Sequence, residues 1–281
     1  VTMNRDSLAD MKSMTDAVHR HGGAISAQLT HAGSFTFLPK TEMATSRPLS
    51  ASGGFNKVGV LSNRFFKKAM NLAEIDSMVE EFVVAALLAK EAGFDAVELH
   101  MGHGYLLSQF ASPLYNKRKD EFGGTIKRRL KFPNEVLSRV LDAVGKDLAV
   151  LVKFSMTDGV KGGNSIEEGI EIAKSLEKTG AHMAVLSNGM NVDSIQEMFG
   201  SPLPKTSTKP ANAVIGLGMW LQSLTAPPDK QFHENYLQDN AQKIRAAVNM
   251  PLAYIGGAKS KQGVDNILAG GFDAIAMGRA L

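Results

Sequence analysis

Hydrophobic residues along the chain follow two alternating periods, and this alternation predicts helices and strands in turn. Apolar side chains recur every three or four positions in some segments, as on one face of a helix, and every second position in others, as on one face of a strand. Helices are expected at residues 8–21, 73–92, 125–144, 165–179, 234–248 and 261–269. Strands are expected at residues 24–29, 95–100, 148–155, 182–187, 251–255 and 272–277.

The regular order of strand and helix determines the expected fold class. Six expected strands alternate with helices, and no Gly-x-Gly-x-x-Gly motif follows any of them. This pattern favours an α/β protein of the parallel (β/α)8 TIM-barrel type over a Rossmann sheet. We expect a single domain over residues 1–281. Because a closed barrel of this type has eight strands, about six of them are expected here, with the first two strands and the last helix missing.

Two long stretches without a regular period interrupt the pattern. Residues 34–71 contain prolines and a Gly-Gly pair, and residues 188–232 carry the single tryptophan, Trp220. Loops of this length inside a compact domain are usually functional, so the first stretch is interpreted as an excursion beside the active site. Pro133 is expected to kink or break the helix at residues 125–144.

The strand expected at residues 95–100 has two chemically different faces. Glu98 and His100 share one face, whereas Val97 and Leu99 share the other, because successive side chains of a strand point to opposite sides. Such a strand suits a barrel in which the polar side looks inward and helices cover the apolar side.

The loop after this strand gathers groups that can do chemistry. His100, His103 and Tyr105 fall within six positions, and Gly102 and Gly104 let the chain turn tightly between them. Two imidazoles and a phenol can place two hydrogen-bond donors and a proton source at one small site. Two alternatives stay open: a satisfied polar pair beside a packing tyrosine, or two zinc ligands. Zinc is the weaker alternative because no cysteine and no obvious third ligand follows, so we expect no metal site.

Composition narrows the class of protein further. The chain has 281 residues, a net charge of +3 and 44% hydrophobic residues, values that are ordinary for a globular domain. Its basic residues are mostly scattered, so we expect no nucleic-acid partner. The absence of cysteine excludes disulfides, thiolate catalysis and an iron–sulfur cluster held within this segment. No apolar run approaches the ~20 residues of a membrane span and no signal peptide opens the chain, so we expect no membrane partner and a cytoplasmic location.

The stretch Ala92–Gly124, AGFDAVELHMGHGYLLSQFASPLYNKRKDEFGG, resembles the signature of the old yellow enzyme family of FMN-dependent oxidoreductases. The resemblance is specific because it runs in register over the whole stretch. A second motif, QLTHAGS, resembles the family's Q-L-x-H-A-G-R, with Ser34 in place of the arginine. The resemblance implies FMN and NAD(P)H as cofactors and an electron-poor alkene as the small-molecule partner; assembly into a homo-oligomer is left open.

The same resemblance implies roles for the residues of the histidine loop. His100 and His103 would hydrogen-bond the carbonyl or nitro oxygen of the substrate and stabilise the charge that develops there. Tyr105 would deliver a proton to the α carbon of the alkene as a general acid.

The resemblance also implies a set of residues that hold FMN. Lys153 stands where the family has an arginine beside the flavin N1 atom and C2 carbonyl, and Gln28 would bond the edge of the ring. A structural pair of Glu98 with Lys153 is the alternative for this lysine. Glycine N–H groups and an arginine fork after two consecutive strands suit a phosphate group. The residues expected to bind it are Gly256, Gly257, Gly278 and Arg279.

Two other functions stay open. The larger branch of the superfamily, the dienoyl-CoA reductases and amine dehydrogenases, carries a cysteine-bound cluster after the barrel. In addition, the family's first two strands supply contacts to the flavin ring that have no counterpart in this sequence. A truncated and catalytically inactive barrel that does not hold flavin is therefore the second alternative.

Overall fold

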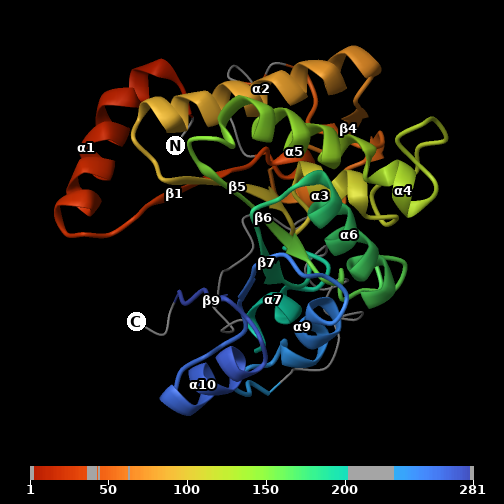
Figure 1. Ribbon diagram of the computed structural model, residues 1–281. Coiled ribbons are helices and arrows are strands. Elements are labelled where there is room, and N and C mark those ends of the chain that lie inside the picture. The colour runs from red at the N-terminus through yellow and green to blue at the C-terminus, as the bar shows by residue number, and fades with distance from the viewer. Residues whose placement is uncertain (1–2, 37–42, 44, 63, 202–230, 279–281) are drawn as a thin grey trace.

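Six parallel strands form a single open sheet in the computed structural model, which describes residues 3–36, 43, 45–62, 64–201 and 231–278 (Figure 1). Each strand pairs with the next one along the chain, in the order β1-β5-β6-β7-β8-β9, as in a β/α barrel and unlike a doubly wound sheet. Within the described residues, β1 and β9 are not paired with each other. The strands are β1 Ser26–Leu29, β5 Ala96–Met101, β6 Ala149–Ser155, β7 Met183–Ser187, β8 Leu252–Tyr254 and β9 Ala274–Ile275.

Helices alternate with these strands, and the predicted α/β fold class is confirmed. Figure 1 shows α2 and α5 side by side along the sheet. The longer helices are α1 Leu8–Arg20, α2 Leu72–Glu91, α5 Lys131–Val144, α6 Ile166–Thr179, α9 Gln238–Arg245 and α10 Lys261–Ala269. Shorter ones are α3 Leu106–Ala111, α4 Ile126–Arg129 and α7 Ile195–Phe199, with 3-10 turns at η1 Arg5–Ser7, η2 Gly33–Phe35 and η4 Lys57–Ser62. In the described part of the chain, no helix is both long and apolar enough to cross a membrane.

Two local signals set the helix bounds as the sequence predicts. Ser165 caps α6 through the capping box with Glu168, and Gly180 ends it with φ of 103°, a left-handed conformation that glycine adopts without strain. The helix expected at residues 125–144 is broken into α4 and α5. Pro133 lies in the first turn of α5, where its missing N–H would have had no acceptor within the helix.

The main hydrophobic core lies between the outer face of the sheet and the helices. On β5, Val97 and Leu99 are buried to within 1% of full burial, whereas Glu98 on the opposite face is only half-buried. The neighbouring strand β6 repeats the pattern, with Val152 buried and Lys153 half-buried. Register pairs His100 with Lys153 at the same level of the two strands. The polar and apolar faces predicted for residues 95–100 are therefore present.

The stretch at residues 34–71 is more ordered than the irregular excursion that the sequence predicts. It contains a small second sheet in the order β2-β4-β3, built from β2 Leu49–Ser50, β3 Gly54–Phe55 and β4 Phe66–Ala69. Two of these strands have only two residues, which is too short for an alternating pattern to be recognised. Most of the second long stretch, including Trp220, lies outside the described residues.

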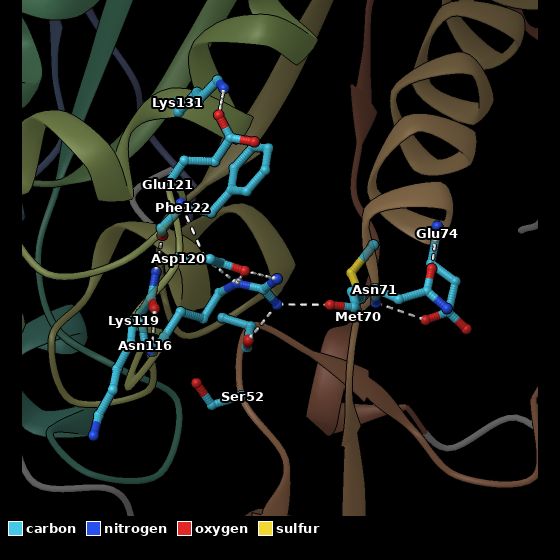
Figure 2. A network of polar contacts seen from close by, with 12 residues as sticks. Ser52, Met70, Asn71, Glu74, Asn116, Lys119, Asp120, Glu121, Phe122 and Lys131 are labelled. Carbon is cyan, nitrogen blue, oxygen red and sulfur yellow. Dashed lines mark hydrogen bonds and ion pairs between the residues drawn. The ribbon is translucent and has the colours of Figure 1, made fainter.

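Arg118, within the signature stretch, fastens the small sheet to the barrel. Its partners Asp120 and Met70 lie on the two sides of the polar network in Figure 2. Its Nη1 donates hydrogen bonds to the carbonyl oxygens of Ala51 at 3.0 Å and Met70 at 2.6 Å, the residues that directly follow β2 and β4. Its Nε and Nη2 pair with the carboxylate of Asp120. The Arg118 side chain is only 9% exposed, so these carbonyl groups have little water to replace it.

Replacing Arg118 with methionine keeps the aliphatic stem but removes every donor. We expect the free energy of unfolding to fall by roughly 2–3 kcal/mol, because two carbonyl groups and a carboxylate lose a buried charged partner. Urea denaturation measures the change. The control is Arg5→Met, because Arg5 pairs with Glu91 at 3.5 Å and its side chain is 77% exposed, so we expect a loss below about 0.5 kcal/mol there. Equal losses in the two variants would contradict the fastening role.

Candidate active site

The loop after β5 has an unusual backbone that presents its side chains at the carboxyl end of the strand. His103 has φ of 60° and Gly104 has φ of 84°, and the first of these is uncommon for a residue with a side chain. A conformation of this kind costs about 1–3 kcal/mol and persists where the surroundings enforce it. Tyr105 then occupies the N-cap of α3, and its N–H donates to Gly102 O at 3.2 Å.

Three polar rings meet above the end of β5. The His100 and His103 ring centroids are 4.9 Å apart with the planes at 80°, and His100 and Tyr105 are 4.8 Å apart at 77°. The structure therefore brings together the three residues that the sequence proposes as a catalytic group. Phe35, which sequence reasoning missed, packs its ring against Tyr105 at 6.0 Å. Phe35 comes from the segment after β1, far away in sequence from the histidine loop.

Both imidazoles are neutral at physiological pH. Burial, reinforced by the neighbouring His103 imidazole and the positive charge of Lys153, lowers the pKa of His100 to about 3. Burial and the charge of Lys153 likewise lower the pKa of His103 to about 3. A neutral imidazole has one N–H donor and one acceptor nitrogen, so the hydrogen bonds around each ring decide which nitrogen can serve a ligand.

Hydrogen bonds fix both rings from the protein side. The Gly102 N–H donates to His100 Nδ1 at 3.2 Å, and His103 Nε2 lies 2.7 Å from Ser187 Oγ. The main-chain N–H of His103 donates to Ser155 Oγ at 3.1 Å. Sequence reasoning did not single out either serine. The available signal was their shared position at the ends of adjacent strands.

A cavity of about 750 Å³, within the size range of cofactor sites, opens beside the His103 ring. It brings together residues from the ends of β6, β7, β8 and β9 that are distant in sequence. The polar and glycine residues of the lining are His103, Lys153, Ser187, Ser201, Tyr236, Gly257, Lys259 and Gly278. His100, Tyr105, Gln28 and Gly256 are not part of this lining, and Arg279 lies outside the described residues.

The Lys153 ammonium is the half-buried cation of this cavity. The structural alternative, a pair of Glu98 with Lys153, is not formed, because Glu98 Oε1 instead accepts a hydrogen bond from Gln28 Nε2 at 2.5 Å. Within the described residues, no hydrogen bond or ion pair holds the Lys153 ammonium. An unpaired, half-buried cation is suited to an anionic ligand.

The glycines after β8 and β9 differ in whether their surroundings leave space for a side chain. Gly257 has φ of 76°, and a Cβ there would lie 2.8 Å from the Phe232 ring. A Cβ on Gly278 would meet no atom within 4 Å, so this backbone borders open space. Gly256 is required for packing, since a Cβ there would collide with the Tyr254 hydroxyl. The cavity, its cation and its exposed glycine backbone thus fit a phosphorylated, anionic cofactor such as FMN.

Comparison with known proteins identifies the family. Residues 2–226 match the sequence model of the NADH:flavin oxidoreductase / NADH oxidase family. The chain is 34% identical to the 4,4'-dithiodibutanoate disulfide reductase of Rhodococcus erythropolis, over 100% of this chain and 68% of that protein. It is 33% identical to the NADH oxidase of Thermoanaerobacter brockii, over 98% of this chain and 37% of that protein. The chain belongs to the NADH:flavin oxidoreductase / NADH oxidase family, whose cofactors are FMN and NAD(P)H.

A solved structure supports the fold independently. The old yellow enzyme homologue from Zymomonas mobilis superposes with a TM-score of 0.69 at 24% identity, covering 98% of this chain and 68% of that one. At this level of identity the likeness concerns the fold alone. The resemblance seen in the signature stretch is therefore confirmed at the level of family and of barrel fold. The chain spans 68% of the length of the first relative and 37% of the length of the second. The activity and substrate are therefore proposed below.

The low pKa values of His100 and His103 predict a pH dependence that NMR can measure. We expect neither imidazole to titrate between pH 5 and 8 in the folded protein, whereas both titrate near 6.5 in concentrated urea. Because the unfolded chain takes up these protons first, the contribution to stability is complete above pH 6.5 and is lost as the pH falls toward 3. The urea midpoint should decrease over that window. A folded-state midpoint near 6.5 for either ring would contradict the burial of both.

Proposed function

We propose that this chain is the catalytic barrel of an FMN-dependent oxidoreductase that uses NAD(P)H to reduce electron-poor alkenes. Family membership supports the flavin and nicotinamide parts of the proposal. The observation that carries the alkene part is the cluster of His100, His103 and Tyr105 beside the cavity that Lys153 enters. When bound, FMN supplies the hydride that the substrate accepts at its β carbon.

The cavity residues would bind the cofactor through charge and exposed backbone. Lys153 would stabilise the negative charge that a reduced flavin accumulates, although a lysine lacks the two-pronged geometry of the family's arginine. Gln28 would bond the edge of the ring from the neighbouring strand. The phosphate would be held after β8 and β9, by Gly257 and Gly278 of the cavity lining. The family resemblance implies the same role for Gly256 and Arg279.

The two imidazoles would bind the substrate's carbonyl or nitro oxygen. Neutral His100 and His103 can each donate one N–H, and donors already in position stabilise charge that develops on the oxygen as hydride arrives. Losing one such donor typically costs about 10²–10³ in rate. Their burial favours this role, since hydrogen bonds are stronger where water is excluded.

Tyr105 would supply the proton. A phenol can donate a proton as a general acid, and the Tyr105 ring packs against the rings of His100 and Phe35. In the proposed reaction the alkene gains hydride at the β carbon and the Tyr105 proton at the α carbon. The tyrosine then recovers a proton from solvent, so that the site returns to its starting state.

A disulfide is a second candidate substrate. The relative that is 34% identical over 100% of this chain is named for the reduction of 4,4'-dithiodibutanoate. Hydride and a proton would convert such a disulfide into two thiols, with the same donors at the site. Since this chain has no cysteine, the thiols would belong to the substrate alone. An amine dehydrogenase-like activity and a barrel without flavin are the remaining alternatives.

The proposal is tested by the half-reactions of the purified protein. FMN is added to the chain, NADH or NADPH is mixed in without oxygen, and bleaching of the flavin absorbance is followed. The reduced protein is then mixed with a nitroalkene, an α,β-unsaturated ketone or 4,4'-dithiodibutanoate. We expect rapid reoxidation by the alkenes. Reoxidation by the disulfide alone would mean that disulfides, and not alkenes, are the substrates. Failure to retain FMN would contradict the proposal as a whole.

Replacing Tyr105 with phenylalanine separates proton transfer from the other steps. We expect reoxidation by the alkene to slow by roughly 10²–10⁴-fold, the usual contribution of a general acid, while flavin reduction by NAD(P)H stays nearly unchanged. Stopped-flow absorbance measures both half-reactions. Tyr115→Phe is the matched control, because it also removes a phenol hydroxyl, one that donates to Asp193 at 2.6 Å. An equal loss in both half-reactions of the Tyr105 variant would make Tyr105 a packing residue.

A further inference from the structure

Ser187 makes the most direct side-chain contact with the histidine pair. Its Oγ lies 2.7 Å from His103 Nε2, and the two residues are only 4% and 6% exposed. Both also line the cavity. The contact occupies one ring nitrogen of a residue that, in the proposed function, has to donate to the substrate. Its direction therefore decides which nitrogen of His103 is available.

The donor in this hydrogen bond follows from the need of the Ser187 hydroxyl for an acceptor. A hydroxyl has a single proton to donate, and a buried O–H without an acceptor is costly. Among the described residues, His103 Nε2 is the acceptor within reach of Ser187 Oγ. The hydroxyl therefore donates to Nε2. A neutral imidazole that accepts at Nε2 carries its proton on Nδ1.

His100 is held in the opposite way. Its Nδ1 accepts the Gly102 N–H at 3.2 Å, so the proton of the neutral ring resides on Nε2. In each ring, the unprotonated nitrogen thus accepts a hydrogen bond from the protein, and the N–H stays available for another partner. If Ser187 were absent, nothing in the described contacts of the His103 ring would favour one tautomer over the other.

We propose that Ser187 is a positioning residue, whose hydroxyl holds the His103 imidazole in the tautomer with its proton on Nδ1. The consequence for catalysis, that this N–H serves the substrate oxygen, rests on the proposed function. The tautomer itself does not, because it depends only on contacts within the protein. The hydrogen bond that one imidazole nitrogen makes commonly decides which of the two nitrogens carries the proton.

Ser155 provides the natural comparison. It is the register partner of Ser187 on the adjacent strand, and it also contacts His103, but through the main chain. Its Oγ accepts the His103 N–H at 3.1 Å and donates to Gly189 O at 2.9 Å. The two serines therefore hold the same residue differently: Ser155 supports the backbone conformation, and Ser187 selects the state of the ring.

Nitrogen-15 NMR of the imidazole rings tests the proposal in the full chain. In the wild type we expect His103 to show a protonated Nδ1 and an unprotonated Nε2. In Ser187→Ala we expect averaged shifts from a mixture of tautomers, and in Ser187→Thr, which retains a hydroxyl, a return to the wild-type pattern. Ser155→Ala removes the same group from the neighbouring strand and is expected to keep the Nδ1-protonated ring. A wild-type ring protonated on Nε2, or an unchanged ring in Ser187→Ala, would overturn the proposal.

Kinetics of the FMN-loaded protein add a second measurement. We expect kcat/KM for an activated alkene to fall by roughly ten-fold in Ser187→Ala and to recover in Ser187→Thr. The proposed alkene reduction and the Ser187-dependent tautomer can be contradicted separately. A protein without alkene activity but with the expected tautomers would remove the proposed function and leave the role of Ser187 in place. Alkene reduction with a tautomer that is independent of Ser187 would do the reverse.

Discussion

The alternation of side chains along the parallel strands is the constraint on which the rest of the structure depends. Val97 and Leu99 on β5 and Val152 on β6 are buried under helices, and each contributes about 1.5–3 kcal/mol by its burial. A shift of one residue in register would move these side chains into the cavity and place His100 against the helices. The hydrophobic face therefore determines the position of the polar face, although it takes no part in the chemistry.

Burial at the inner face then sets the chemical state of the site. The same exclusion of water that lowers the pKa of His100 and His103 leaves both rings neutral, and the pairing of Glu98 with Gln28 leaves Lys153 without a carboxylate partner. The outcome is a cavity with neutral donors on one side and an uncompensated cation on another. This combination favours a ligand that gains negative charge during the reaction.

The sequence predicts the order of elements because the core is periodic, and it predicts the histidine loop because that chemistry is local. His100, His103 and Tyr105 are neighbours along the chain, so their proximity needs only a tight turn. Ser187 and Phe35 were missed, since they reach the rings from segments that are distant in sequence and that the folded sheet brings close. The small second sheet was also missed, because its hydrogen bonds join strands too short to show a period. Gln28 is on β1, which pairs with the His100 strand β5, but it lies outside the cavity lining.

We propose that the inner face of this sheet binds FMN through Lys153, and the most direct test is an FMN titration followed by quenching of flavin fluorescence. We expect the wild type to bind, Lys153→Met to bind roughly ten-fold more weakly, which is about 1.4 kcal/mol, and Lys161→Met, at an exposed position, to match the wild type. Equal affinity in all three proteins, or no quenching by the wild type, would contradict the account.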